Sequence, residues 1–224
     1  MVFPIIHLLA SAATAIVTAV ASAGPAIASF VTTVAPTLAK IAQVAGPIIS
    51  NIVKVAEVVL PIFHVFNKDE KVEDMGERAL QAAENGIVLG EFDDFDEYVE
   101  QLREFKLNPE IAEKRDPIVQ TITGLGIGAI GLEEKLDLNR GNLNGIWLLA
   151  AGDSKYFTPS RIEEFLTSGQ LTGNILGYLN NQLTASDARD FEKKLETGMN
   201  ESEAAELYQA LDNATANLAE FKAE

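Results

Sequence analysis

The amino-acid sequence predicts an all-α fold, and two observations lead to this prediction. Residues 2–66 repeat an apolar pattern every eleven residues, which corresponds to about 3.67 residues per helical turn. The rest of the chain contains amphipathic segments with helix start and stop signals. No run alternates polar and apolar residues for long enough to indicate a sheet.

Three prolines, Pro25, Pro36 and Pro47, mark the eleven-residue repeat. When the segment is aligned on them, two columns contain only apolar residues and two contain only polar ones. The apolar columns are Ile16, Ile27, Leu38, Ile49 and Leu60, and Ala19, Phe30, Ile41, Ile52 and Phe63. The polar columns are Thr18, Ser29, Lys40 and Asn51, and Thr32, Gln43 and Lys54. Because the two polar columns are three positions apart, they predict one narrow polar stripe on a helical surface that is otherwise apolar.

The prolines also predict where helices begin. Each proline removes one helical hydrogen bond, so a continuous helix would kink at each of them. Short helices that begin at each proline avoid this cost, because proline is tolerated at the first helical position. Gly24 precedes Pro25 and Gly46 precedes Pro47, and glycine commonly ends a helix. We therefore expect a series of helices of roughly ten residues, or one long kinked helix.

Charged side chains are scarce in this segment. Residues 2–66 carry only three, those of Lys40, Lys54 and Glu57. Helices that are apolar nearly all round are buried in protein or in lipid. Residues 8–35 are free of charge and exceed the length of about 20 residues that a transmembrane helix needs. Their many small residues, however, favour close contact between helices.

Three alternatives follow for the apolar segment: membrane insertion, assembly within a protein tube or an oligomer, and burial in an ordinary core. In the first two cases, replacing Ile41 or Ile52 by Asp is expected to abolish insertion or assembly while leaving the rest of the chain folded. A cleaved signal peptide is a further alternative, because Ala21, Ser22 and Ala23 resemble a cleavage site after an apolar run. Against it, no Lys or Arg precedes that run, and the apolar pattern continues far beyond the site.

Composition divides the chain at Asn67. Residues 1–66 contain two lysines and one glutamate, a net charge of +1, whereas residues 67–224 contain 15 basic and 32 acidic residues, a net charge of −17. The sequence thus predicts a hydrophobic helical segment over 1–66 and an acidic, soluble, α-helical domain over 67–224. So negative a domain repels phosphate backbones, and no direct nucleic-acid binding is expected.

The acidic region is predicted to form several helices. Residues 69–85 form the first, which ends at Gly86, and the second begins at Asp93 or Asp94 and ends near Asn108. One face of the second helix is predicted to be core: Phe95, Tyr98, Val99, Leu102 and Phe105. A third runs from Asp116 and Pro117 toward Leu138. Further starts are predicted at Thr158, Thr184 and Asn200, and further stops at Gly169 and Gly198.

One glycine-rich motif allows a different interpretation. Gly126, Gly128 and Gly131 match G-x-G-x-x-G, which opens a dinucleotide-binding helix when it follows a strand. That hypothesis needs strands at 118–122 and 146–151, and a dinucleotide fold needs more strands than these. The alternative is that Gly124 and Gly128 form a notch of small residues against which another helix packs. The uncharged run 117–132 is also compatible with a second membrane-seeking hairpin.

No catalytic or metal-binding constellation is recognisable. The chain contains no cysteine, and its two histidines, His7 and His64, have no neighbouring carboxylate or second ligand. The acidic cluster at 93–97 lacks the glycine and the distal glutamate of a calcium loop. We therefore expect a non-enzymatic protein without a cofactor or a metal.

The predicted function is that of a delivery or membrane-active protein. Its apolar helices would insert into a bilayer or line a conduit, as in internal components of bacteriophage virions, injection machines or small pore-formers. This likeness is one of composition alone. The alternative is a structural subunit whose N-terminal helices pack into a lipid-free homo-oligomeric bundle. A membrane, virion or secreted location is favoured over the free cytoplasm.

The partners expected from this function are a lipid bilayer, a tube-forming protein or further copies of the chain. The residues expected to form the membrane or assembly segment are Gly24, Pro25, Phe30, Pro36, Lys40, Ile41, Gly46, Pro47, Ile52, Lys54, Glu57 and Phe63.

Overall fold

Helices are the only regular elements within residues 14–223, the residues that the computed structural model describes. The prediction of an all-helical chain is confirmed for these residues. His7 and the rest of residues 1–13 lie outside the described part. Residues 14–21 are helical and are followed by the 3-10 helix η1 (Pro25–Ile27) and the helices α2 (Ala28–Thr33), α3 (Ala35–Val44) and α4 (Gly46–Ile62).

Each of the three prolines that mark the repeat lies in the first turn of an element, where the missing N–H group breaks no helical hydrogen bond. Before the first of these elements, Gly24 has a φ of 112°, and a Cβ atom there would lie 2.9 Å from Cγ1 of Val88. Gly46 does not act as such a break. It is the first residue of α4, and the chain turns at Ala45, where φ is −145°.

The second part of the chain contains the remaining elements. They are α5 (Val72–Glu84), η2 (Leu89–Glu91), α6 (Phe95–Glu104), α7 (Pro109–Lys114), α8 (Pro117–Lys135), α9 (Ile146–Gly152), α10 (Pro159–Thr167), α11 (Ile175–Leu179), α12 (Ala185–Leu195) and α13 (Glu201–Ala223).

Five predicted helix starts are confirmed. Four are N-caps whose side-chain oxygens accept hydrogen bonds from the backbone N–H groups of Glu97, Ile118, Arg161 and Asp187: Asp94, Asp116, Thr158 and Thr184. The fifth is Asn200, whose Oδ1 accepts from the backbone N–H groups of Ser202 and Glu203. The predicted stops at Gly86, Gly169 and Gly198 are confirmed as well, because all three have positive φ.

Three predicted boundaries are wrong by a few residues. The first helix of the acidic region begins at Val72 and not at residue 69. The helix predicted to extend toward Leu138 ends at Lys135, because Asp137 takes a left-handed conformation and the N–H of Leu138 donates to the carbonyl of Glu133. The second helix of the acidic region ends at Glu104 rather than near Asn108.

The dinucleotide hypothesis is wrong. The two segments that it requires as strands are helical, since 118–122 lies in α8 and 146–151 lies in α9. Gly131 instead faces Val65 and Phe95, with a built Cβ atom only 2.3 Å from Cγ1 of Val65. Its small size therefore serves packing.

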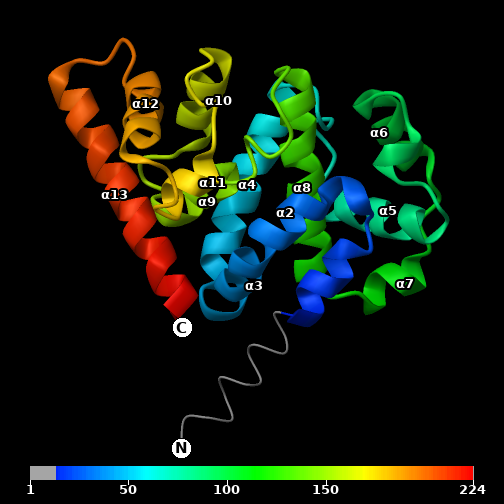
Figure 1. The fold of residues 1–224 in the computed structure, drawn as a ribbon. Coiled ribbons are helices and arrows are strands. Elements are labelled where there is room, and N and C mark those ends of the chain that lie inside the picture. The colour runs from blue at the N-terminus through cyan, green and yellow to red at the C-terminus, as the bar shows by residue number, and fades with distance from the viewer. Residues whose placement is uncertain (1–13, 224) are drawn as a thin grey trace, which may run out of the picture.

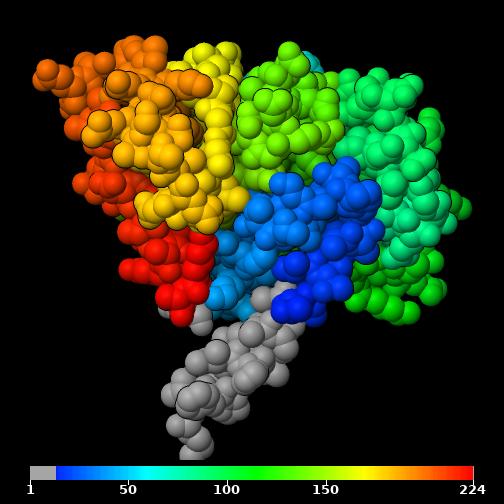
Figure 2. All heavy atoms as spheres, viewed as in Figure 1, coloured from blue at the N-terminus to red at the C-terminus, as the bar shows by residue number. Residues whose placement is uncertain are grey.

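Helices α4 and α8 run through the middle of the molecule, with α10, α12 and α13 on one side and α5, α6 and α7 on the other (Figure 1). The composition changes at Asn67, in the connection between α4 and α5. Buried residues from before and after this point nevertheless form one hydrophobic cluster. The space-filling view shows atoms of α2 and α3 at the surface between the two groups of outer helices (Figure 2).

Candidate assembly and membrane-contact surface

The two apolar columns of the repeat point into the core. Every residue of the first column is buried, and in the second column Phe30, Ile41 and Ile52 are at most 1% exposed. Ala19 and Phe63 are half-buried. The polar columns lie at or near the surface: five of the seven residues are exposed, and Lys40 and Gln43 are half-buried. The helices therefore present their narrow polar stripe outward.

The prolines lie at the surface too. Pro25, Pro36 and Pro47 are exposed, as is Gly46, whereas Gly24 is half-buried. Gly124 and Gly128, expected to form a packing notch, face two different helices. A Cβ atom on Gly124 would lie 2.0 Å from the carbonyl O of Val72 in α5, and one on Gly128 would lie 2.8 Å from Cδ1 of Leu60 in α4.

The three charged residues of the apolar segment have different surroundings. The Lys40 ammonium donates a 2.8 Å hydrogen bond to the carbonyl O of Lys222, near the end of α13, where a cation is favourable. The Glu57 carboxylate lies 3.4 Å from the ammonium of Lys71. Lys54 is exposed and forms no hydrogen bond or ion pair with any other residue of 14–223.

Lys54 and Glu57 line a groove between α4, the start of α5 and the start of α8. Its volume is about 660 Å³. Apolar side chains of α4 and α8 and the charged side chains of both walls line it: Gly46, Ile49, Ser50, Val53, Lys54, Glu57, Lys71, Glu73, Asp74, Pro117, Ile118 and Thr121. The sequence did not predict this groove, because it depends on how α5 and α8 are placed beside α4.

A ridge of exposed residues on α4 runs beside the groove. Spaced by three and four residues, its members occupy one face of the helix: Pro47, Asn51, Lys54, Val58 and Ile62. Val58 is 46% exposed and Ile62 is 41% exposed. Within residues 14–223 only four large apolar side chains are this exposed, the other two being Val44, just before α4, and Ile111 in α7.

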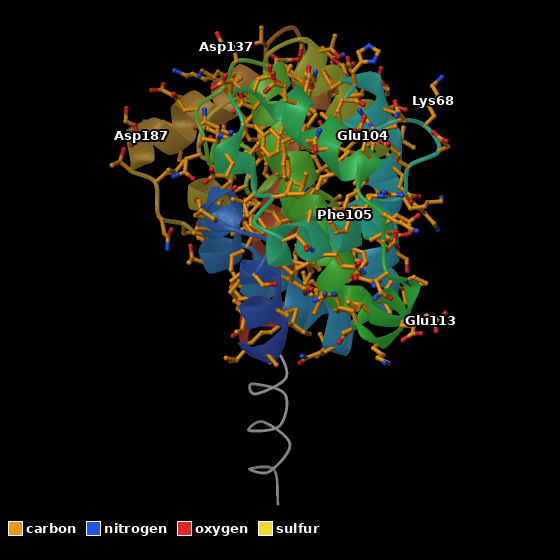
Figure 3. The ribbon with its side chains drawn as sticks, turned by 90° about the vertical axis from the view of Figure 1, so that its right-hand side faces the viewer. Lys68, Glu104, Phe105, Glu113, Asp137 and Asp187 are labelled. Atoms are coloured by element: carbon orange, nitrogen blue, oxygen red, sulfur yellow. The ribbon has the colours of Figure 1, made fainter. Side chains whose placement is uncertain are left out.

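The connection from α4 to α5 is fastened by Glu70. Its carboxylate accepts hydrogen bonds from the backbone N–H of Asn67 at 2.6 Å and from Nε of Arg103 at 2.7 Å. Burial opposes ionisation of Glu70, but the hydrogen bonds from Arg103 and Asn67 outweigh it and lower the pKa of this carboxyl. The contact ties the chain just after the apolar segment to α6. Lys68, in the same connection, lies at the opposite edge of the molecule from Asp187 of α12 (Figure 3).

Glu133 is a second carboxylate with a structural role. It is 1% exposed and accepts hydrogen bonds from the backbone N–H groups of Leu143, at 2.7 Å, and Gly141, at 3.0 Å. Burial raises the pKa of Glu133 despite these two bonds. The side chain holds the loop between α8 and α9 against the end of α8.

No single helix among the described residues is long and apolar enough to cross a membrane. One pair of consecutive helices, bent relative to each other, is together long and apolar enough for a membrane span. It consists of residues 25–33 and 35–44, whose axes differ by 54°. Residues 14–223 contain no group of three or more His, Asp or Glu side chains arranged to hold a metal ion.

The apolar helices, the groove beside α4 and the exposed ridge are thus the features available for interaction with a partner. Comparison of the chain with protein families, with curated proteins and with solved structures finds no match.

Proposed function

We propose that the protein is a membrane-active or delivery protein that stores its apolar N-terminal helices inside a helical body until they enter a bilayer or line a conduit. The observation that carries this proposal is the position of these helices. Their apolar columns are buried or half-buried beneath charged amphipathic helices, and their polar stripe lies at the surface together with a few apolar side chains such as Val58. Such an arrangement keeps a membrane-seeking segment compatible with water.

The contacts that hold the apolar helices favour release into lipid. Between residues 15–66 and residues 67–223, only three side-chain hydrogen bonds or ion pairs form. They are Lys40 with the carbonyl of Lys222, Glu57 with Lys71, and Ser29 with Asn144, whose Nδ2 donates to the hydroxyl oxygen at 2.8 Å. The buried side chains that the two parts share are those of one hydrophobic cluster. A bilayer can replace apolar contacts at little cost, because lipid tails are as apolar as leucine.

The bent pair supports the same proposal. Residues 25–44 are uncharged apart from Lys40, and the two helices together reach the length of a membrane span. Straightening at Val34 and Ala35 would convert them into one helix. Pro36 would then remain inside that helix, where a bilayer-embedded protein tolerates a kink if neighbouring groups satisfy the freed carbonyl.

A reversible covalent lock tests the proposal. The chain has no cysteine, so Ser29→Cys with Asn144→Cys introduces a single pair of thiols at two hydrogen-bonded positions, and loss of both free thiols on oxidation establishes that the disulfide has formed. The disulfide would fasten α2 to the loop after α8. We expect the reduced variant to release dye from phosphatidylcholine vesicles and the oxidised variant not to.

The reduced variant is the matched control, because it differs from the oxidised one by a single bond. Ser29→Cys alone controls for effects of the reductant. Equal dye release by the locked and unlocked forms would contradict storage and release. Absence of both leakage and vesicle binding by the parent chain would contradict membrane activity altogether.

A further inference from the structure

We propose that two copies of this chain associate through α4, with the ridge of each copy lying in the groove of the other. The ridge lies outside the buried columns of the apolar helices, so the proposal does not depend on membrane activity. It rests on shape, on exposed apolar side chains and on the distribution of charge over one face.

The shape is that of a ridge beside a groove. Pro47, Lys54 and Val58 project from α4, and the hollow between α4, α5 and α8 follows the same helix. In a dimer related by a two-fold axis, the same surface of each copy contacts the other copy. That surface must therefore be complementary to itself. A helix ridge adjoining a groove of similar direction meets that requirement, because helices pack ridges into grooves.

The apolar side chains give this contact a driving force. Three of the four large apolar side chains that are most exposed within residues 14–223 lie on α4 or just before it: Val44, Val58 and Ile62. The groove offers Val53 and Ile118, which are half-buried, as partners. Val58 and Ile62 lie one turn apart on the same face of α4, and neighbouring exposed apolar groups are typical of a surface that binds another protein.

The charges specify a second copy as the partner. Lys54 on the ridge has no ion-pair partner within residues 14–223, and neither Glu73 nor Asp74, on the α5 wall of the groove, forms an ion pair there. A two-fold axis places Lys54 of each copy against the acidic wall of the other. Each lysine thus gains acidic partners, and each acidic wall gains a lysine. The formal net charge of −16 per chain opposes any association of copies at long range, which makes this local match necessary.

The experiment is a measurement of mass in solution by sedimentation equilibrium, at physiological ionic strength and over a range of concentrations. We expect the full chain to form a dimer. Val58→Asp is expected to raise the dimer dissociation constant by about tenfold or more, since it places a charge in the apolar contact. Ile111→Asp is the matched control, because Ile111 is 38% exposed on α7 and does not line the groove. It is expected to leave the dissociation constant unchanged.

Charge exchange between copies tests the arrangement itself. Lys54→Glu alone and Asp74→Lys alone are each expected to weaken the dimer, because each creates like charges across both halves of the contact. An equimolar mixture of the two variants is expected to recover the parent's dissociation constant, since each half of the contact in the mixed dimer again joins one acidic and one basic side chain. Contacts within one chain cannot produce recovery on mixing.

Two results would overturn the proposal. A parent chain that stays monomeric at all concentrations excludes association through α4. A dimer that Val58→Asp and the two charge variants leave unchanged forms through another surface. Unaltered circular dichroism, and unaltered thermal unfolding at concentrations where parent and variants are both monomeric, would establish that the substitutions, all at exposed residues, affect association and not folding.

Discussion

Gly76 of α5 and Gly124 of α8 face each other where the two helices cross, and no Cβ atom fits between them. A Cβ atom on Gly76 would lie 1.9 Å from the carbonyl O of Gln120 and 2.7 Å from the backbone N of Gly124. One on Gly124 would lie 2.0 Å from the carbonyl O of Val72. Because these neighbours are backbone atoms, no side-chain rotation can relieve the clash. The backbones of α5 and α8 are therefore in direct contact.

The first prediction concerns this crossing. Gly124→Ala is expected to lower the free energy of unfolding by about 3 kcal/mol, because α5 and α8 must move apart and lose their packing. Urea unfolding followed by the fluorescence of Trp147, the only tryptophan and fully buried, measures the change. Gly46→Ala is the control, since nothing lies within 4 Å of its built Cβ atom. An unchanged urea midpoint for Gly124→Ala would contradict the crossing.

The second prediction uses one arginine with two acidic partners. Arg115 contacts Glu77, whose side chain is 3% exposed, and Glu84, whose side chain is 47% exposed, both at 2.8 Å. Glu77→Ala is expected to lower the free energy of unfolding by about 3 kcal/mol, because it removes the buried partner of the half-buried Arg115 cation. Glu84→Ala is expected to cost less than about 1 kcal/mol, because water screens the exposed pair. Chemical unfolding of both variants measures the two losses of free energy. Equal losses would show that the burial of Glu77 does not make its ion pair more stabilising than that of Glu84.

The third prediction concerns pH and Glu70. Its pKa in the folded chain is lowered, so its stabilising contribution is complete above the pKa of the unfolded chain and is lost as pH falls through the folded pKa. At neutral pH, Glu70→Gln is expected to lower the free energy of unfolding by about 1 kcal/mol. The difference between parent and variant is expected to shrink as pH falls below the usual carboxyl pKa of about 4.3. Unfolding curves at several pH values measure it, and a difference independent of pH would contradict this role.

Local chemistry explains which parts of the fold the sequence could predict. Caps such as Asp94 and Asp116 form hydrogen bonds with residues at most three positions away, so the local sequence is sufficient to predict them. Residues 146–151 carry no such signal, since a short apolar run suits a buried strand as well as a buried helix. Its helical form is set by the surrounding helices α4 and α13.

The interaction surface could be predicted only in part. The eleven-residue columns indicated which side chains of the apolar segment are buried, because they depend on helix periodicity alone. The groove brings Lys54 near Asp74 and Pro117. The hydrogen bond between Arg103 and Glu70 joins residues that are 33 positions apart in the chain. Such contacts follow from the packing of helices distant in sequence, for which a single sequence holds no direct signal.

The last prediction tests whether residues 67–224 can fold without residues 1–66. Ile52 is fully buried in the hydrophobic cluster that also contains Trp147 and Leu149 of α9, and α4 contacts α9 directly. Ile52→Asp is therefore expected to lower the free energy of unfolding by more than about 4 kcal/mol, because it buries an unpaired charge in a core common to both regions. Val58→Asp, on the same helix but 46% exposed, is the control and is expected to cost less than about 1 kcal/mol.

Trp147 fluorescence distinguishes the two outcomes, because Trp147 belongs to the region after Asn67. If the core is indivisible, Ile52→Asp exposes Trp147 to water, its emission shifts to longer wavelength, and a shortened chain beginning at Asn67 is equally exposed. If Trp147 keeps the parent's emission in both proteins, the acidic region folds independently, as its composition predicts. The apolar helices could then leave without unfolding the remaining body, so the result also decides whether the proposed release requires unfolding of the whole chain.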